Sequence, residues 1–235
     1  MKIQVSLSLL LLFFFCIGRA AAQEQEYVTF TYDNGVVSSE GHMLDGIPEG
    51  YWRTFYDDGT LKSEGNRIDH QLDSLWRFYA PSGMITQSIS YQNGKKNGFR
   101  KTYFEDGTIQ KEEEFENDVP IGTIKKYYPS GKLMETLPLD TLGKGKEQGL
   151  GYEFAEDDGR ITAVVEYRNG YVANRDRINR KDKFNQKQGL WREFYPDRKT
   201  KVEGRYSNDK KNGYFKTYDE EGNLVETLKY ADGIL

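Results

Sequence analysis

The chain is poor in the residues that most often build chemical sites. Its 235 residues include one cysteine, two histidines and six prolines. A single cysteine cannot form an internal disulfide. Neither His42 nor His70 belongs to a metal or nucleophile motif, and the sequence shows no phosphate-binding loop, serine elbow or catalytic carboxylate pair. These absences favour a binding protein over an enzyme, and we expect no cofactor and no resident metal.

A surplus of basic charge is lacking as well. The chain carries 33 Lys and Arg against 37 Asp and Glu, a formal net charge of −4. Proteins that bind nucleic acid or anionic membranes neutralise phosphates with a basic surplus, so neither is an expected partner. Aromatic residues make up 14% of the chain. Because disordered segments contain few aromatics, we expect a folded protein.

The first 22 residues have the three-part pattern of a secretory signal peptide. Lys2 precedes a mostly apolar run from Val5 to Ile17, and Ala20, Ala21 and Ala22 supply small residues for cleavage. The run is shorter than the roughly 20 residues that a membrane-spanning helix needs. We therefore predict that residues 1–22 are removed. The remaining chain would be periplasmic or extracellular, with no stable membrane insertion.

A hairpin-sized repeat fills the rest of the chain, in seven or eight copies of about 24 residues. Each copy begins at an anchor position, which is occupied in turn by Gly50, Ser74, Gly98, Gly122, Gly149, Gly189 and Gly213. In the regular copies, the side chain three residues after the anchor is basic and the side chain five residues after it is aromatic. Nine residues after the anchor a second glycine marks a turn: Gly59, Gly83, Gly107, Gly131 and Gly222. Gly35 marks a degenerate first copy.

The turn glycines predict the pairing of the strands. Asp-Gly between strand-like runs is a strong hairpin signal, because both residues tolerate a positive φ. A two-residue turn at Asp58-Gly59 places Arg53 opposite Glu64. The same register places Lys101 opposite Glu112 and Arg192 opposite Glu203, whereas Arg77, Lys125 and Lys216 face hydroxyl groups. Each such cross-strand pair contributes roughly 0.2–1 kcal/mol.

These patterns predict an all-β protein, an elongated antiparallel meander of β-hairpin repeats in a largely single layer. Each unit would mainly contact its neighbours. We expect a first block of repeats at 27–148, an irregular unit with an insertion at 149–188, and a last block at 189–235.

The pattern G-x-W-[RK]-x-[FY]-[YF]-x-x-G-x-[LI] is best matched from Gly50 to Leu61 and from Gly189 to Tyr206. It resembles the YwqK-type variant of MORN repeats over about residues 30–235. The resemblance implies protein-binding β-repeats. Proteins of this kind are often labelled antitoxins of toxin–antitoxin systems, which implies an antitoxin-like, neutralising activity. A classical antitoxin acts in the cytosol, so for an exported chain the label requires an exported toxin.

Two groups of residues are candidate binding sites. The insertion Tyr171 to Gln188 is rich in basic side chains that a protein partner could contact: Arg175, Arg177, Arg180, Lys181 and Lys183. The alternative is a solvated loop or an extra short hairpin that bridges two repeat blocks. The second group is Trp52, Trp76 and Trp191, which could form an aromatic platform for a protein or a glycan. Its alternative is packing between strands.

Acidic turns such as Asp57-Asp58, Glu105-Asp106 and Asp157-Asp158 could bind Ca²⁺, but turn chemistry explains them better. From the sequence we therefore expect an exported, non-catalytic repeat scaffold that binds a protein partner. The alternatives are a glycan-binding module of the cell envelope, an antitoxin-like neutralising protein and, with least support, a hydrolase whose site the sequence does not reveal.

Overall fold

The computed structural model describes residues 25–140 and 145–235, and the regular elements in these two stretches are all β-strands. The first ten strands are β1 (Gln25–Thr31), β2 (Val37–Leu44), β3 (Ile47–Phe55), β4 (Leu61–Ile68), β5 (Gln71–Tyr79), β6 (Ile85–Gln92), β7 (Lys95–Tyr103), β8 (Ile109–Glu116), β9 (Val119–Tyr127) and β10 (Leu133–Pro138). The remaining eight are β11 (Gly149–Phe154), β12 (Ile161–Arg168), β13 (Tyr171–Arg177), β14 (Arg180–Lys181), β15 (Lys187–Phe194), β16 (Thr200–Ser207), β17 (Lys210–Tyr218) and β18 (Leu224–Tyr230).

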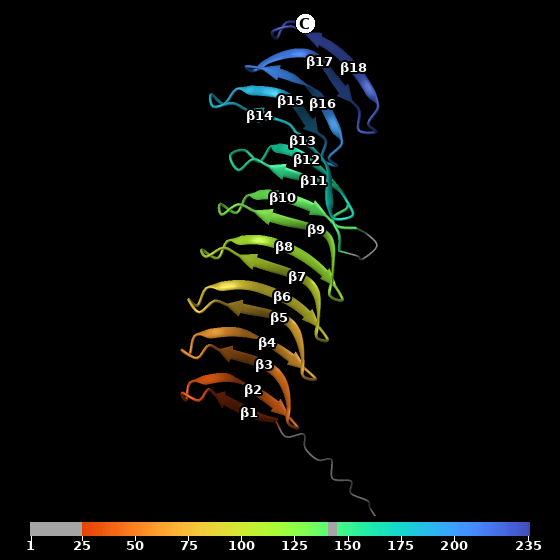
Figure 1. Cartoon of the computed structure of the whole chain (residues 1–235). Helices are drawn as coiled ribbons and strands as arrows, with labels where there is room; N and C mark the ends of the chain where they lie inside the picture. Colours follow the sequence, from red (N-terminus) through yellow and green to blue (C-terminus); the bar gives the residue numbers. More distant parts are fainter. Residues whose placement is uncertain (1–24, 141–144) are drawn as a thin grey trace, which may run out of the picture.

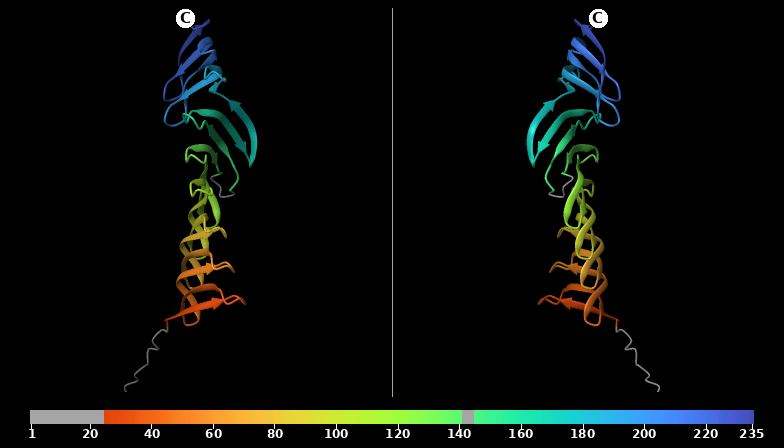
Figure 2. Two further views of the ribbon diagram at one scale, coloured as in Figure 1. Left: turned by 90° about the vertical axis from the view of Figure 1, so that its left-hand side faces the viewer. Right: turned by 90° about the vertical axis from the view of Figure 1, so that its right-hand side faces the viewer.

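Each strand except β13 pairs with the next one along the chain, so the fold is a meander (Figure 1). Strands β1 to β13 form one antiparallel sheet and β14 to β18 form a second. The stack is long and narrow when it is seen from its sides (Figure 2). The predicted all-β repeat meander is thus confirmed. No helix in residues 25–140 and 145–235 is long and apolar enough to span a membrane.

The predicted pairs are confirmed, but the expected two-residue turn at Asp58-Gly59 is wrong. The Tyr56 N–H donates to the carbonyl of Thr60, and the register shifts between Thr54 and Phe55. Arg53 pairs with Glu64, Lys101 with Glu112 and Arg192 with Glu203. Of the pairs predicted between a base and a hydroxyl, Arg77 faces Ser88, Lys125 faces Thr136 and Lys216 faces Thr227. The turn glycines set this register because each supplies a positive φ at the same place in its hairpin.

A bulge bends the first strand of most copies, and the anchor residue lies in it. Between β2 and β3, Gly41 pairs with Trp52 and His42 with Glu49, so Gly50 and Tyr51 have no partner on β2. Gly50 has a φ of 72°, a conformation that L side chains rarely adopt. Ser74, the one anchor that departs from glycine, also has a positive φ, of 58°. Backbone geometry therefore explains the anchor column.

Trp52 and Trp76 pack between strands, as the second of the two sequence-based interpretations expects. They are only 6% and 2% exposed, on the sheet face that we call the inner face. The Trp76 ring lies directly on Gly65, where a Cβ atom would be 2.4 Å from the ring. Its indole Nε1 donates a hydrogen bond to the carbonyl of Asn66 at 2.8 Å. A glycine on the preceding strand lets each ring lie flat against the backbone. Trp52 and Trp76 are therefore buried and do not form the exposed aromatic platform that the sequence suggested.

The expected insertion between Tyr171 and Gln188 is a region of strands rather than a docking loop. It contains β13, which pairs with β12, and β14, which pairs with β15. The alternative of an extra short hairpin is correct in part, because the short β14 strand forms a hairpin with β15, whereas β13 extends the first sheet. The hydrogen-bonded ladder changes from the first sheet to the second between β13 and β14, at residues 178–179.

The chain crosses between the two sheets through two buried residues. Ile178 is fully buried against Phe154 and Ile161. The amide Nδ2 of Asn179 donates hydrogen bonds to the carbonyls of Ile161 on β12 and Arg192 on β15, both at 2.9 Å. Its Oδ1 accepts a hydrogen bond from the backbone N–H of Arg192 at 2.7 Å. Asn179 therefore connects the two sheets with its side chain.

Candidate functional site

A row of exposed apolar side chains follows the length of the molecule on the sheet face opposite Trp52, which we call the outer face. Five members stand one position after the anchor of their copy, and Tyr27 lies 24 residues before Tyr51. The copies that begin at Gly122 and Gly189 have Thr123 and the half-buried Leu190 at this position and do not contribute. Their side chains are between 41% and 61% exposed. We call this set the apolar row, and its members are Tyr27, Tyr51, Leu75, Phe99, Leu150 and Tyr214.

The bulge explains why these side chains are exposed. Tyr51, Leu75, Phe99 and Tyr214 each lie in the stretch of their strand that has no pairing partner on the preceding copy. A bulge changes the direction in which a side chain points. On the following strand they face polar residues, namely Asn66, Ser90, Glu114 and Lys229. Members of the row in successive copies are two strands apart, which is about 10 Å.

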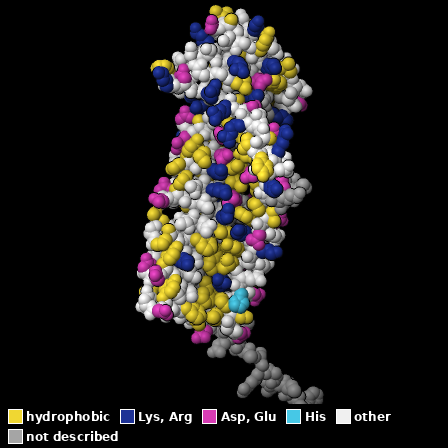
Figure 3. Space-filling model, viewed as in Figure 1, with side chains coloured by type: hydrophobic (Ala, Val, Ile, Leu, Met, Phe, Trp, Pro, Cys, Tyr) yellow, Lys and Arg dark blue, Asp and Glu magenta, His cyan; other side chains and the backbone are white. Residues whose placement is uncertain are grey.

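A ladder of paired charges runs beside the apolar row on the outer face. It passes from strand to strand, and we call its members the charge ladder: Glu40, Arg53, Glu64, Arg77, Ser88, Lys101, Glu112, Lys125 and Thr136. Lys101 and Lys125 both contact Glu112, at 3.2 and 3.5 Å. The charges neutralise one another, so the outer face is polar without a strong net sign. Figure 3 shows one long face, where basic side chains follow the long axis beside hydrophobic patches.

Glu64 is the most heavily bonded carboxylate of the ladder. It accepts hydrogen bonds from the hydroxyls of Tyr51 and Tyr79, the latter at 2.7 Å. Burial raises the pKa of Glu64, but the two hydrogen bonds and the charges of Arg77 and Arg53 outweigh it and hold this pKa below its usual value. Burial and the bond to Glu64 raise the pKa of both tyrosines to about 12. The hydroxyls therefore stay protonated and hold the row and the ladder together.

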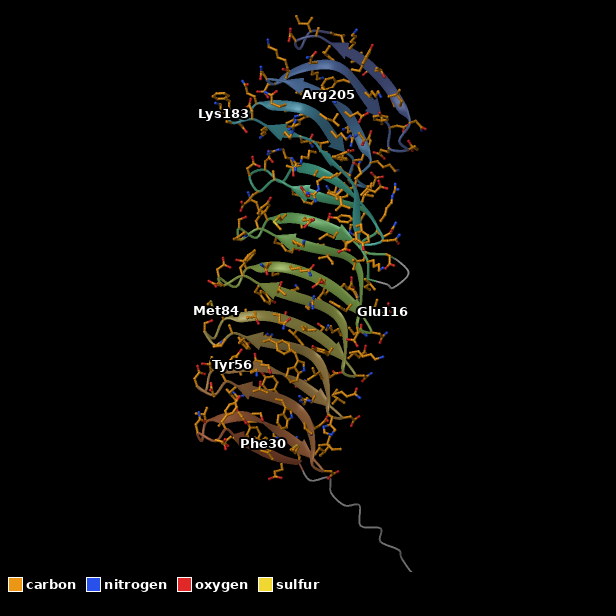
Figure 4. All side chains as sticks on the ribbon, viewed as in Figure 1. Phe30, Tyr56, Met84, Glu116, Lys183 and Arg205 are labelled. Carbon is orange, nitrogen blue, oxygen red and sulfur yellow. The ribbon has the colours of Figure 1, made fainter. Side chains whose placement is uncertain are left out.

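The five basic residues predicted from the insertion do not gather at one place. Arg175 pairs with Glu153 at 3.2 Å and Lys181 with Asp158 at 3.1 Å. Arg177 is exposed at the end of β13, and Arg180 begins β14. Lys183 lies in an exposed turn, on the edge that also carries Tyr56 and Met84 (Figure 4). Two of the five charges are therefore neutralised and the others are spread over strand ends and a turn.

Trp191 differs from the other two tryptophans. Its ring is partly exposed, lies edge-on to Tyr206 with centroids 5.8 Å apart, and is covered by the Lys187 ammonium at 4.6 Å. The column that holds Trp52 and Trp76 in the first copies is thus more accessible at Trp191, whereas Phe215 in the next copy is again buried. Trp191 is the one predicted tryptophan that lines a surface groove, together with Phe194 and Pro196.

The acidic turns use their carboxylates to close the turns. Asp58, Asp106 and Asp158 each accept a hydrogen bond from the backbone N–H two residues further on, at 2.8, 2.8 and 3.1 Å. This is the arrangement of an Asx turn. In the described part of the chain, no group of three or more His, Cys, Asp or Glu residues is placed to hold a metal ion.

The apolar row and Asn179 are the features that the sequence reasoning missed. The row has a signal, because the position after each anchor is aromatic or aliphatic in most copies. Asn179 has no such signal in the sequence, because it lies in the irregular segment, where the residues do not correspond to positions of the repeat. Chemically, the outer face combines exposed aromatics with neutralised charges and hydrogen-bonding groups. Such a face suits the binding of a polypeptide or a stacked sugar.

Fold and face together define an open antiparallel array of β-hairpin repeats that displays one apolar side chain on its outer face in each of six copies. Four segments match the sequence model of a family described as MORN repeat variant, at residues 48–69, 96–117, 120–140 and 211–232. The matches fall on the hairpins β3–β4, β7–β8, β9–β10 and β17–β18. The β5–β6 and β15–β16 hairpins have the same register, so the repeat extends beyond the matched segments. No curated protein matches the chain.

Proposed function

We propose that this protein is an exported, non-catalytic repeat scaffold that binds a protein partner through the apolar row and the charge ladder of its outer face. The observation that carries the proposal is the regular exposure of one apolar side chain per copy in six copies. Isolated exposed apolar residues are ordinary on a protein surface, but a column of them repeated along one face offers a partner several apolar contacts at once. Tyrosine is also among the residues that contribute most to protein interfaces.

The neighbours of the row support binding of a polypeptide. Lys101 lies 5.9 Å from the Phe99 ring, and Lys229 lies 5.6 Å from the Tyr214 ring. A partner that covers the row would also contact these ammonium groups, so apolar and charged contacts would be made together. Aromatic anchors surrounded by polar groups are the usual composition of a transient protein interface.

The test compares two variants in a cross-linking pull-down from envelope and medium fractions of the native cells. The test variant replaces three members of the apolar row by serine: Tyr51, Leu75 and Phe99. The control variant replaces three exposed apolar residues outside the row by serine: Ile68, Met84 and Ile234. We expect the native protein and the control to retain the same partner and the test variant to lose it. Equal capture by both variants would contradict the proposal.

Glycan binding is a second candidate, which the even spacing of the row favours. Tyr27 and Tyr51, in successive copies about 10 Å apart, offer two stacking surfaces on one face. Tyrosine and tryptophan fluorescence measured across a panel of cell-envelope polysaccharides and peptidoglycan tests this candidate. A change that disappears in the row variant supports glycan binding, whereas an unchanged signal with every polysaccharide rejects it.

Export and antitoxin-like neutralisation are further parts of the proposal. Residues 1–22, on which the export prediction depends, lie outside the described residues. Cell fractionation with N-terminal sequencing of the purified protein tests export, and a first residue near Gln23 is the expected result. Neutralisation predicts that the captured partner is toxic when it is produced without this chain. A harmless partner would leave the scaffold proposal standing and remove the antitoxin-like one.

A further inference from the structure

One hairpin turn has a long, charged side chain at the position where the other hairpins have glycine or, in the β14–β15 hairpin, Asn185. The turn glycine of the β15–β16 hairpin is replaced by Arg198, which has a φ of 73°. Its backbone N–H donates to the carbonyl of Tyr195 at 2.9 Å, just as Gly59 donates to Tyr56 at 3.0 Å. The turn is therefore unchanged, but a bulky side chain occupies a conformation that favours glycine. Strain of this kind is retained where the side chain has a use.

The Arg198 side chain reaches across the boundary between the two sheets. Its guanidinium lies 5.3 Å from the centroid of Tyr152 and 5.4 Å from that of Phe154, both on β11. A guanidinium can stack on aromatic rings with its face and still donate hydrogen bonds from its edge. The two rings thus hold the group in place and leave its donors available.

Arg198 has no acidic partner among the described residues, which is also true of Arg177 and Arg180 on either side of the crossing between the sheets. Its neighbours are paired: Arg192 with Glu203 and Lys199 with Asp197, both at 3.1 Å. Among residues 25–140 and 145–235, the Arg198 side chain makes no hydrogen bond or ion pair, and its contacts are the two rings. In a chain with a net charge of −4, an unpaired and preoriented arginine is a local site for a negative group.

The guanidinium opens into a groove that joins the apolar row. We call this the boundary groove, and it is lined by Leu150, Tyr152, Arg198, Thr200, Glu203 and Tyr218, among others. Its volume is about 600 Å³, within the range of about 300–1,000 Å³ that is usual for ligand sites. The lining acids are already compensated, because Glu203 is held by Arg192 and by the Tyr218 hydroxyl at 2.9 Å. Leu150 belongs to both the groove and the row, so one ligand can contact both.

We infer that the boundary groove binds an acidic segment of the protein partner, with an Asp or Glu carboxylate on the edge of the Arg198 guanidinium and an apolar neighbour against Leu150 and Tyr152. This inference rests on the proposed function and names the chemistry of the partner at one place. The fork geometry of arginine suits a carboxylate, since two parallel N–H groups meet two oxygens.

The experiment is a selection of random twelve-residue peptides displayed on phage against the purified full-length chain. The selected peptides are then synthesised, and their affinities are measured for the native protein and for Arg198→Gln, Arg198→Lys and Arg198→Gly. Arg198→Gly introduces the residue that hairpins such as β3–β4 use at this turn, so its folding is expected to be intact. Arg168→Ala is the matched control, because Arg168 is an exposed arginine on β12 that pairs only with Glu166.

We expect the selected peptides to share an Asp or Glu beside an apolar residue. Their affinity should fall about tenfold or more in Arg198→Gln and Arg198→Gly, fall less in Arg198→Lys, and stay unchanged in Arg168→Ala. Peptides without an acidic preference, equal binding to all variants, or no selected peptide would overturn the inference. Binding of oligogalacturonate in place of any peptide would overturn it as well.

The outcome is separable from that of the proposed function. If Arg198→Gln leaves partner capture and peptide binding unchanged while the row variant loses capture, the inference fails and the scaffold proposal stands. If acidic peptides bind through Arg198 while the row variant still captures the partner, the groove is a site and the row is not.

Discussion

The regular copies and the boundary between the two sheets bury their side chains in different ways. In β2 to β5 the buried hydrophobic side chains are two single rings, Trp52 and Trp76, each laid on a glycine of the preceding strand. Around β9 to β15 buried residues form two clusters, one of Ile124, Leu137, Leu139, Ala163, Val165 and Tyr167 and one of Phe154, Ile161 and Ile178. The regular part therefore depends on contacts between neighbouring strands, and the boundary depends on a small hydrophobic core. Regular copies can be repeated without a core, but a change of sheet needs one.

The largest expected effect is at the boundary. Ile178→Ala should lower the free energy of unfolding by about 2–5 kcal/mol, because it opens a cavity in a fully buried cluster. It should also separate the unfolding of the two sheets. Urea denaturation checks this with native probes, since Trp52 and Trp76 report on the first sheet and Trp191 on the second. Ile89→Ala in the regular part is the control. If it separated the unfolding transitions of the two sheets as much as Ile178→Ala does, the boundary would not differ from the regular copies.

A second change tests the ring-on-glycine packing of the regular part. Gly65→Ala places a methyl group against the Trp76 ring and should cost about 1–3 kcal/mol, which is usual for overpacking. The cost should shrink when Trp76 is replaced by leucine, because the smaller side chain leaves space. A double-mutant cycle measured by thermal unfolding checks the coupling. Additive effects of the two substitutions would show that the ring and the glycine act independently.

A third change tests the bonds between successive copies. The Tyr56 hydroxyl donates to the carbonyl of Tyr79 at 2.8 Å, and Tyr32, Tyr128 and Tyr195 make the same kind of bond to the next copy. Tyr56→Phe should cost about 1 kcal/mol. Phe104 occupies the equivalent position without a hydroxyl, so Phe104→Tyr should have the opposite sign. Urea titration of both variants checks this, and a stabilising Tyr56→Phe would refute it.

The smallest effect is a dependence of stability on alkaline pH. Because burial and the hydrogen bond to Glu64 raise the pKa of Tyr79 to about 12, the folded state holds this proton more firmly than the unfolded chain. The stabilisation is complete below the unfolded value of about 10 and is lost as the pH rises towards 12. Between pH 10 and pH 12, the urea midpoint of unfolding should fall less steeply with pH in Tyr79→Phe than in the native protein. The control is Tyr171→Phe, at a tyrosine that is 77% exposed. If it flattens the slope equally, the assignment to Tyr79 is wrong.

The fold was predictable because its determinants are local and repeated. Turn glycines such as Gly59 fix the hairpins, and the alternation of residues between them fixes the register. The exposure of Trp52 was not predictable in the same way, since the depth of a ring depends on the glycine of another strand, Gly41. The sheet boundary was missed because Ile178 and Asn179 occur once and belong to no repeated column.

The candidate site was predictable only in part. The basic residues of the insertion were the obvious choice by composition, yet strand formation spreads them over β13, β14 and a turn. The apolar row follows from two repeated facts, the anchor and the residue after it. Its exposure, however, depends on the bulge, which appears only when the strands are paired.

The most direct test of the central claim is site-specific photo-cross-linking in the native cells. A photoreactive phenylalanine is placed at Phe99 in the apolar row or at Met84 in a hairpin turn, two positions of similar exposure, 45% and 41%. The account predicts one discrete cross-linked protein species from position 99, of the same mass as the partner captured by pull-down, and none from position 84. A cross-link from position 84 alone, or from neither position, would contradict binding through the outer face.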